Sequence, residues 1–269
     1  MIEKKILAVA IILILVSVAS ADDETSKLDD GVKLKNQAMS VIIVTCILVT
    51  ALVILAIISK RKLHNHKRML FLFMIIPIIA ATLYTAGTTI YLNQISITKG
   101  PVHWHADFEI WNCGKKMDPV NPQGLSNRVG TPVFHEHNDF RIHVEGVVVK
   151  EEDVILRNFF QVLGGGLTEN DLTIPSRDEI ISLHDGDLCN GKPGKIQVFV
   201  YTVVNPQEPG NWIFTQEKIA DYTKYVLSPY SHVPPGDCII IEFDQEKEKT
   251  DKICTTYEAA IKKGELHGR

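Results

Sequence analysis

Hydrophobic residues are distributed differently before and after about residue 92. Before it they form long apolar runs at 6–18, 38–59 and 69–92, and after it they alternate with polar residues, as in a water-soluble domain. A helix that crosses a bilayer needs roughly 20 consecutive apolar residues, a length that the second and third runs reach and the first does not. The pattern therefore predicts two transmembrane helices, followed by one soluble domain at 101–269.

The first apolar run has the layout of a secretory signal peptide. Lys4 and Lys5 precede it, and Ala19-Ser20-Ala21 then matches the small-residue cleavage site of such signals. Residues 1–21 are therefore interpreted as a signal peptide, with an uncleaved short hydrophobic helix as the alternative. The next residues, 22–37, are polar and acidic and are expected to form a flexible segment.

Basic residues between the two longer runs predict the orientation of the chain. The connecting residues, 60–68, contain Lys60, Arg61, Lys62, Lys67 and Arg68. Loops rich in lysine and arginine stay in the cytoplasm, so everything after the second span is expected on the outer side of the cell membrane. The lipid bilayer is thus the first predicted partner, and the soluble domain is predicted to be extracytoplasmic.

Periodicity beyond residue 100 predicts an α+β domain with a mostly antiparallel or mixed sheet and two or three helices. Residues 102–111 alternate clearly: Trp104, Ala106, Phe108 and Ile110 form an apolar face, with charged residues and histidines on the other. We expect further strands at 134–137, 140–149, 179–183, 196–204 and 238–243, helices at 151–163 and 250–263, a partly helical stretch at 215–227, and a loop at 117–131.

Three pairs of metal-ligand residues lie between positions 103 and 145. Side chains two positions apart on a strand point to the same face, so each pair aims two ligands into one volume. The pairs contain five of the chain's ten histidines. Their members are His103 with His105, His135 with His137, and His143 with Glu145.

These residue types predict a transition-metal site. Imidazole nitrogens suit zinc, copper, iron and nickel, and a carboxylate can complete the set. A tetrahedral zinc site needs three or four protein ligands, so either some of the six candidates orient the others, or two metals bind, or only part of the set converges. Asp107 and Glu136 are candidates for outer carboxylates that orient a ligand or act as a base. Zinc is the first choice and copper the second, because no methionine accompanies the pairs as a soft ligand for copper(I).

The cysteines agree with an oxidising compartment. Cys46 lies in the first predicted span, whereas four cysteines lie in the soluble domain. An even number outside the cell suggests two disulfide bonds, for which three pairings are possible. The preferred pairing is Cys113 with Cys189 and Cys238 with Cys254, the second because it would attach a C-terminal helix to the preceding strand.

Charge and motifs exclude few functions directly. A net charge of −4 gives no electrostatic argument for a nucleic-acid partner. Neither a phosphate-binding loop, nor a GxSxG element, nor an HExxH helix occurs in the sequence.

Four segments resemble a family of uncharacterised membrane-anchored proteins from archaea and bacteria. The segments are HWHADF, FHEHND, RIHVEG and, in the following helix, NFFQVLGG, and the likeness covers about residues 101–205. The resemblance implies a membrane-anchored protein in which the three pairs belong together. It implies no activity, because the family has none established.

Three functions of different classes follow as hypotheses. The first is a membrane-anchored, extracytoplasmic domain that binds zinc or copper. The second is a metal-dependent hydrolase or hydratase, which requires an open coordination position and a nearby base. The third is a cell-envelope interaction domain whose histidines are structural. For the histidines themselves, a metal-free catalytic or pH-sensing cluster is a separate alternative.

Overall fold

The computed structural model describes the chain except for residues 1–29, 60–65, 120, 123–126, 177–178 and 228–235. The chain divides into two compact units, residues 1–95 and 96–269. The expected signal peptide at 1–21 and most of the expected basic loop lie outside the described residues. Within the described part there are four α-helices and a mixed sheet, so the α+β class with a mixed sheet is confirmed.

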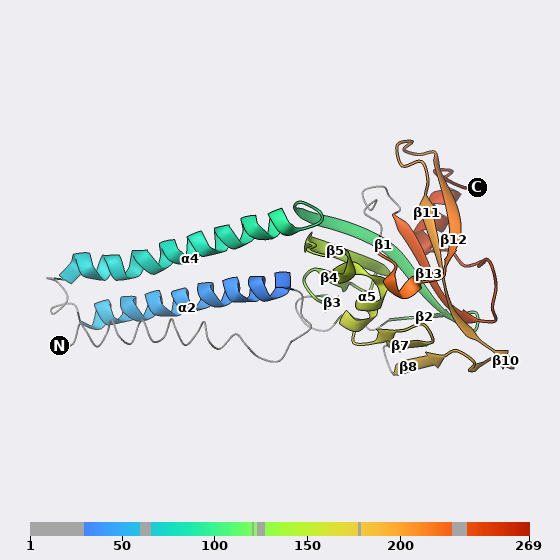
Figure 1. The fold of residues 1–269 in the computed structure, drawn as a ribbon, viewed down its shortest axis with the longest axis horizontal. Helices are drawn as coiled ribbons and strands as arrows, with labels where there is room; N and C mark the ends of the chain where they lie inside the picture. Colours follow the sequence, from blue (N-terminus) through green and yellow to red (C-terminus); the bar gives the residue numbers. More distant parts are fainter. Residues whose placement is uncertain (1–29, 60–65, 120, 123–126, 177–178, 228–235) are drawn as a thin grey trace. The chain divides into compact units, whose positions relative to one another are not determined.

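Two long apolar helices make up the described part of the first unit. Helix α2 (Asp30–Ile58) and helix α4 (Lys67–Ile95) lie side by side (Figure 1). Both are long and apolar enough to cross a membrane. Helix α2 begins earlier than the apolar pattern predicted, so residues 30–37 of the expected flexible segment are helical. Lysine and glutamine are good helix formers, and the polar sequence there can therefore continue the hydrogen-bonded ladder of the span.

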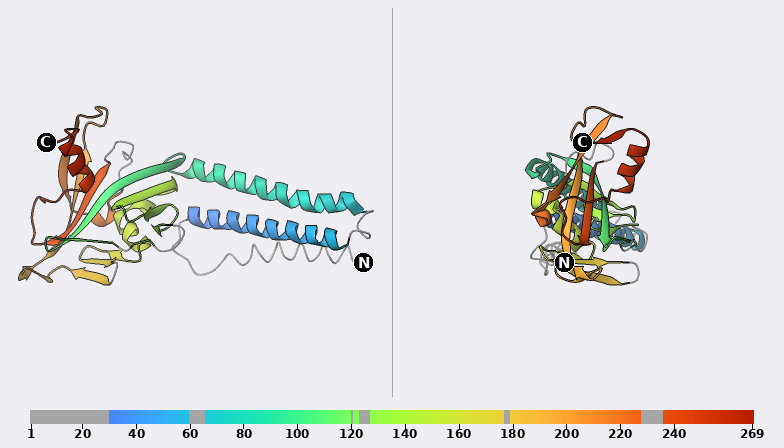
Figure 2. Two further views of the ribbon diagram at one scale, coloured as in Figure 1. Left: turned by 180° about the vertical axis from the view of Figure 1, so that it is seen from behind. Right: turned by 90° about the vertical axis from the view of Figure 1, so that its right-hand side faces the viewer.

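The second unit is organised around a nine-stranded sheet (Figures 1 and 2). Strand β1 runs antiparallel to β5 and parallel to β13, and β12 pairs in parallel with β14. The order across the sheet is β14 (Leu266–Gly268), β12 (Trp212–Ile219), β11 (Lys195–Val203), β13 (Asp237–Asp244), β1 (Pro101–Asn112), β5 (Arg141–Val147), β4 (Phe134–Glu136) and β3 (Val129–Gly130), with β2 (Lys115–Met117) paired to β1.

The two faces of this sheet are covered by different helices and strands. Alternate residues of β13 belong to different cores: Ile239 and Ile241 to the larger one, Cys238 and Ile240 to the smaller. The larger core lies under helix α5 (Leu156–Val162) and a small sheet of β6 (Gly166–Leu167), β7 (Asp171–Pro175) and β8 (Ile180–His184). The smaller core lies under helix α6 (Thr255–Lys262). A separate hairpin joins β9 (Leu188–Cys189) to β10 (Lys192–Pro193).

Buried carboxylates of β1 attach helix α6 to the sheet. Glu109, which is 3% exposed, accepts hydrogen bonds from the backbone N–H and the hydroxyl of Thr255 at 3.2 and 3.1 Å, at the helix N-terminus. It also forms an ion pair with Lys116 at 2.6 Å. Asp107 binds Arg141 at 2.8 Å and accepts a hydrogen bond from Thr256. An anion is favoured at a helix N-terminus, so these contacts fix where α6 lies.

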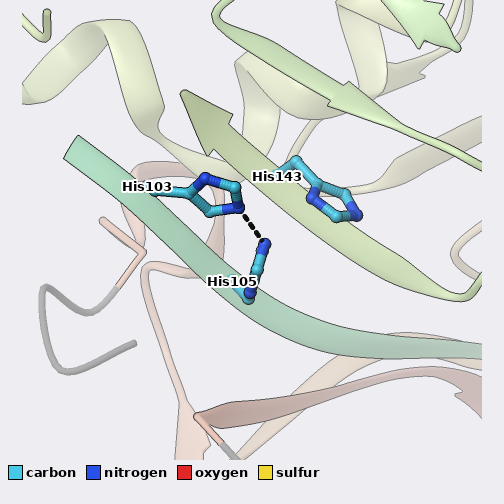
Figure 3. A group of neighbouring side chains, drawn as sticks. All are labelled: His103, His105 and His143. Atoms are coloured by element: carbon cyan, nitrogen blue, oxygen red, sulfur yellow. Dashed lines mark hydrogen bonds between the residues drawn. The ribbon is translucent and has the colours of Figure 1, made fainter. Parts of the chain in front are cut away.

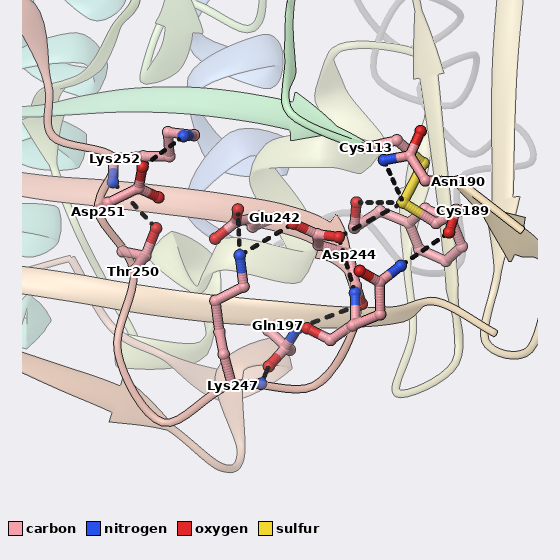
Figure 4. Close-up of polar contacts among 12 residues, drawn as sticks. Cys113, Cys189, Asn190, Gln197, Glu242, Asp244, Lys247, Thr250, Asp251 and Lys252 are labelled. Carbon is pink, nitrogen blue, oxygen red and sulfur yellow. Dashed lines mark hydrogen bonds and ion pairs between the residues drawn. A yellow bond between two sulfur atoms is a disulfide. The ribbon is translucent and has the colours of Figure 1, made fainter. Parts of the chain in front are cut away.

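Both expected disulfides are present in the structure. Cys113 is bonded to Cys189, and Cys238 is bonded to Cys254 just before α6. Close to the first disulfide, Lys247 bridges Glu242 and Asp244 at 2.9 Å each (Figure 4). This ion pair ties the segment after β13 back onto its own strand.

Several predicted elements differ from the structure. The expected helix at 151–163 is divided, because Ile155 is extended and bridges to Val226, leaving a 3-10 turn (Glu151–Val154) before α5. The expected partly helical stretch at 215–227 is wrong in its first half, which belongs to β12. That strand lies between β11 and β14 and is half-buried, so its side chains show no clean alternation and strand pairing decides its conformation. A 3-10 turn does follow it (Tyr222–Lys224).

The C-terminal helix is shorter than the predicted 250–263. It begins at Thr255 because Cys254, held by its disulfide, has an extended backbone. Within this helix Tyr257 is fully buried, whereas Ile261 is exposed. The predicted loop at 117–131 also contains the two residues of β3.

Replacing Glu109 with alanine should destabilise the second unit by about 3–5 kcal/mol, because it leaves Lys116 and the start of α6 without their buried partner. All three tryptophans of the chain lie in this unit, so tryptophan fluorescence during urea unfolding of the full chain in detergent reports on it alone.

The matched control is Glu258→Ala. That carboxylate is half exposed and lies 3.7 Å from Lys262 on the surface of α6, so its removal should change the free energy of unfolding by at most about 1 kcal/mol. Equal effects of the two substitutions would show that Glu109 does not hold the helix.

Candidate metal centre

Four of the five histidines lie on the adjacent strands β1, β5 and β4, on the face of the sheet that carries α6, and His137 directly follows β4. Strand register places His105 opposite His143 and His143 opposite His135, so β1, β5 and β4 each contribute one imidazole to a single row. Two residues before His105 on β1, His103 lies opposite Glu145 of β5. The residues between them, such as Trp104 and Val144, point into the larger core. Alternation along each strand thus separates the apolar side chains from the ligand-type side chains.

One group consists of His103, His105 and His143, whose candidate ligand atoms all lie within 4.8 Å of one another. The Nε2 atoms of His103 and His105 are 2.8 Å apart, and the two rings point toward each other beside His143 (Figure 3). Glu145 adds a carboxylate: its Oε1 lies 3.4 Å from Nε2 of His103 and 4.0 Å from Nδ1 of His143. We call these four residues site A.

A second group consists of His135, His137 and His143, again with candidate ligand atoms within 4.8 Å. The ring centroids of His137 and His143 lie 4.7 Å apart. The ring of His135 is stacked on the ring of His143, with 5.4 Å between the centroids. His143 therefore belongs to both groups.

In His143 and His137, a hydrogen bond at one ring nitrogen leaves the other nitrogen without a proton and available to bind a metal. The Nε2 atom of His143 lies 3.1 Å from Oδ2 of Asp139, which places the ring proton there and leaves Nδ1 as an acceptor. Nδ1 of His137 contacts the backbone carbonyl of Asn127, which can only accept, so Nε2 of His137 is left without a proton. A carboxylate or carbonyl that holds the second ring nitrogen is a common partner of metal-binding histidines.

Two of the imidazoles have buried nitrogens with no hydrogen-bond partner. These are Nδ1 of His143 and Nδ1 of His135, whose residues are 7% and 2% exposed. An unsatisfied buried polar group costs about 1–3 kcal/mol, so such atoms in a folded protein need an explanation. A bound cation would supply the missing partner.

Burial also keeps the imidazoles neutral. It lowers the pKa of His105 to about 4, with the neighbouring His143 and His103 as further causes. Burial likewise lowers the pKa of His135 and of His143. Only the neutral imidazole binds a metal, so these three side chains are in the ligand form at neutral pH.

The two carboxylates expected to support the site make their hydrogen bonds to other groups. Asp107 contacts Arg141 and Thr256, as described above, and its pKa is raised by burial. Glu136 is fully buried and accepts a hydrogen bond from the backbone N–H of Asn138, and burial raises its pKa to about 7.

Sequence reasoning missed Asp139 and Asn127, the residues whose oxygens contact the second ring nitrogens of His143 and His137. Asp139 lies two residues after the second HxH pair, and the Asn138-Asp139 turn returns the chain to β5, so its closeness to His143 was a detectable signal. No sequence signal indicates Asn127, because only its backbone carbonyl takes part.

The depressed pKa of His105 predicts how the stability of the metal-free protein depends on pH. Between pH 6.5, the ordinary pKa, and about pH 4, the unfolded chain binds a proton at this side chain and the folded chain does not. Stability should therefore be lost as the pH falls through this window. The measurement is Tm against pH for the metal-free full chain in detergent, followed by tryptophan fluorescence.

His105→Asn should flatten this dependence, whereas the control His267→Asn, at an exposed position, should leave it unchanged. Identical pH profiles for wild type and His105→Asn would contradict the burial of His105 as a neutral imidazole.

No protein-family profile, curated protein or solved structure matches the chain in comparisons made on its sequence and its fold. The case for a function therefore depends on the residues and their geometry.

Proposed function

We propose that this chain is a membrane-anchored protein whose extracytoplasmic domain binds a transition-metal ion at site A, zinc first and copper second. The observation that carries the proposal is the state of His143. Its Nδ1 is buried and without a hydrogen-bond partner, faces the carboxylate of Glu145, and belongs to a ring whose Nε2 is held by Asp139.

The ligand set of site A suits zinc. Three imidazole nitrogens and one carboxylate oxygen make four ligands, the number that zinc takes in tetrahedral sites. Two nitrogens bound to one zinc at about 2.0–2.1 Å lie roughly 3.3 Å apart. The 2.8 Å between His103 and His105 and the 4.0 Å between His143 and Glu145 bracket that value. Small side-chain rotations would therefore complete the coordination.

A purely structural role for the histidines explains the arrangement less well. Structural histidines in a core are normally hydrogen-bonded at both ring nitrogens or point one of them to solvent. Here two buried nitrogens lack partners, and the row of three neutral imidazoles gains no stabilisation from mutual charge. A metal ion at site A satisfies Nδ1 of His143 and offsets the cost of gathering the imidazoles of that site.

Three features support an extracytoplasmic, membrane-anchored address. Helices α2 and α4 are long and apolar enough to span a membrane. The two disulfides are typical of oxidising compartments. The basic residues between the two helices favour a cytoplasmic connection, which would put the second unit outside.

A metal-dependent hydrolase or hydratase is the second candidate, and exposure of His103 favours it. The side chain of His103 is 61% exposed, so solvent reaches site A. If Glu145 acts as a base rather than a ligand, three histidines hold the metal and the fourth position is open for water, as in catalytic zinc sites. In this reading Glu145 would take a proton from the bound water.

The proposal predicts that the purified full chain contains at least about one zinc or copper ion per chain. Elemental mass spectrometry measures this content after loading and desalting at neutral pH. His103→Ala/His143→Ala should remove the metal held at site A, because it deletes two of the three imidazoles. The matched control, His184→Ala/His267→Ala, also deletes two histidines but at exposed positions away from the site, and should keep wild-type content. Metal content that is zero in wild type, or equal in the two double variants, would contradict the proposal.

A second prediction concerns Asp139. Replacing Asp139 with alanine frees Nε2 of His143 and allows the ring to turn, so the affinity of site A for zinc should fall about 10–100-fold. Competition with a zinc-chelating indicator measures the change. Asp251→Ala, which removes an exposed carboxylate that forms an ion pair with Lys252 at 2.8 Å, should leave the affinity within twofold of wild type. A wild-type affinity in Asp139→Ala would show that this carboxylate does not orient the ligand.

A further inference from the structure

The five histidines form two triplets that meet at one residue. Ring contacts link His103 and His105 to His143, and others link His135 and His137 to His143. Among the residues that the structure describes, no ring contact joins the first pair directly to the second. His143, on the central strand β5, therefore separates two groups of possible ligands on either side of it.

The two nitrogens of His143 face different carboxylates. Nδ1 lies 4.0 Å from Glu145, which belongs with His103 in site A. Nε2 lies 3.1 Å from Asp139, which follows His137 in the turn between β4 and β5. Each nitrogen of this imidazole thus faces a different carboxylate.

The second group has its own available ligand atoms. His135 has a buried Nδ1 without a partner, which is an independent sign of a missing ligand because site A does not use this residue. His137 has Nε2 available, because its Nδ1 is held by the carbonyl of Asn127. Asp139 supplies a carboxylate that is 43% exposed, so an ion can reach the group from solvent. We call His135, His137, Asp139 and Nε2 of His143 site B.

We propose that site B binds a second transition-metal ion and that His143 bridges the two ions as an imidazolate. The proposal rests on the proposed function, since the first ion at site A uses Nδ1 of the same ring. Binding of the second ion displaces the proton from Nε2 of His143. Asp139, which accepts a hydrogen bond from that N–H in the metal-free state, takes up the proton, passes it to solvent and becomes a ligand. One proton leaves for each bridge formed, in keeping with the proton release that accompanies metal binding to histidine.

The bridge has a geometric consequence. Two ions bound at about 2.0–2.1 Å to the two nitrogens of one imidazole ring lie about 6 Å apart. Such a pair is too far apart for direct contact but remains coupled electronically through the ring. Two unpaired electrons at such a centre therefore interact, whereas at two unrelated sites they do not.

The test uses the full chain in detergent, titrated with copper(II) and followed by elemental analysis and electron paramagnetic resonance. The wild type should bind two ions per chain, and the second equivalent should weaken the signal of the first through coupling across His143. His135→Ala/His137→Ala should bind one ion and show the full, uncoupled signal of a single site. His103→Ala/His105→Ala should likewise bind one ion, at site B. Because His135 is buried, the single variant His137→Ala, at a half-buried position, provides the same test with less risk to folding, which tryptophan fluorescence checks.

The outcomes separate this inference from the proposed function. One ion in wild type, unaffected by His135→Ala/His137→Ala, would overturn site B and leave site A intact. Two ions with additive, uncoupled signals would overturn the bridge. No bound ion in any form would overturn both the inference and the proposed function. Two coupled ions, reduced to one uncoupled ion by removal of His137, would establish the bridge.

Discussion

The pairing of β1 with β5 is the constraint on which the rest of the site depends. Side chains alternate strictly between the faces of a sheet, so a shift of one residue in this pairing would turn one strand's histidines away from those of the other. The observed register aligns His105 with His143 and His103 with Glu145. It is maintained from the opposite face, where Trp104, Phe108 and Val144 are buried in the larger core. Hydrophobic burial on one face thus positions the ligands on the other.

The same face of β1 serves two purposes along its length. Toward the C-terminal end, Asp107 and Glu109 are buried and hold the start of α6. Toward the N-terminal end, His103 and His105 lie beyond those helix contacts, and His103 is largely exposed. The helix therefore satisfies the acidic half of the strand, and the histidine half stays available to a ligand from solution. This division explains why four successive polar positions on one strand face have such different surroundings.

Much of this arrangement is predictable from the sequence because it depends on local periodicity. The alternation of residues 102–111 predicted strand β1 and its two faces, and the HxH spacing predicted that His103 and His105 share a volume. Two apolar helices and both disulfides were also expected and are present. The metal itself stays a proposal, since ligand type and spacing indicate a cation without identifying it.

The features that the sequence did not predict depend on contacts between distant residues. Register between β4, β5 and β1 decides that His135, His143 and His105 form one row, and no local pattern contains that information. Asp107 was expected beside an imidazole, but Arg141 lies opposite it on β5 and takes its carboxylate. The first half of the stretch expected to be partly helical, 215–227, belongs to strand β12. Its stabilisation comes from pairing with β11 and β14 on either side, which its own sequence pattern does not reveal.

The central claim is that imidazoles of β1 and β5 hold a transition-metal ion. X-ray absorption at the zinc edge of the zinc-loaded full chain tests it most directly, because this measurement reports the ligand atoms around the ion. The account predicts only nitrogen and oxygen neighbours, at about 2.0–2.1 Å, with outer-shell scattering from about three imidazole rings. Sulfur neighbours at about 2.3 Å, or a first shell without imidazole scattering, would contradict it.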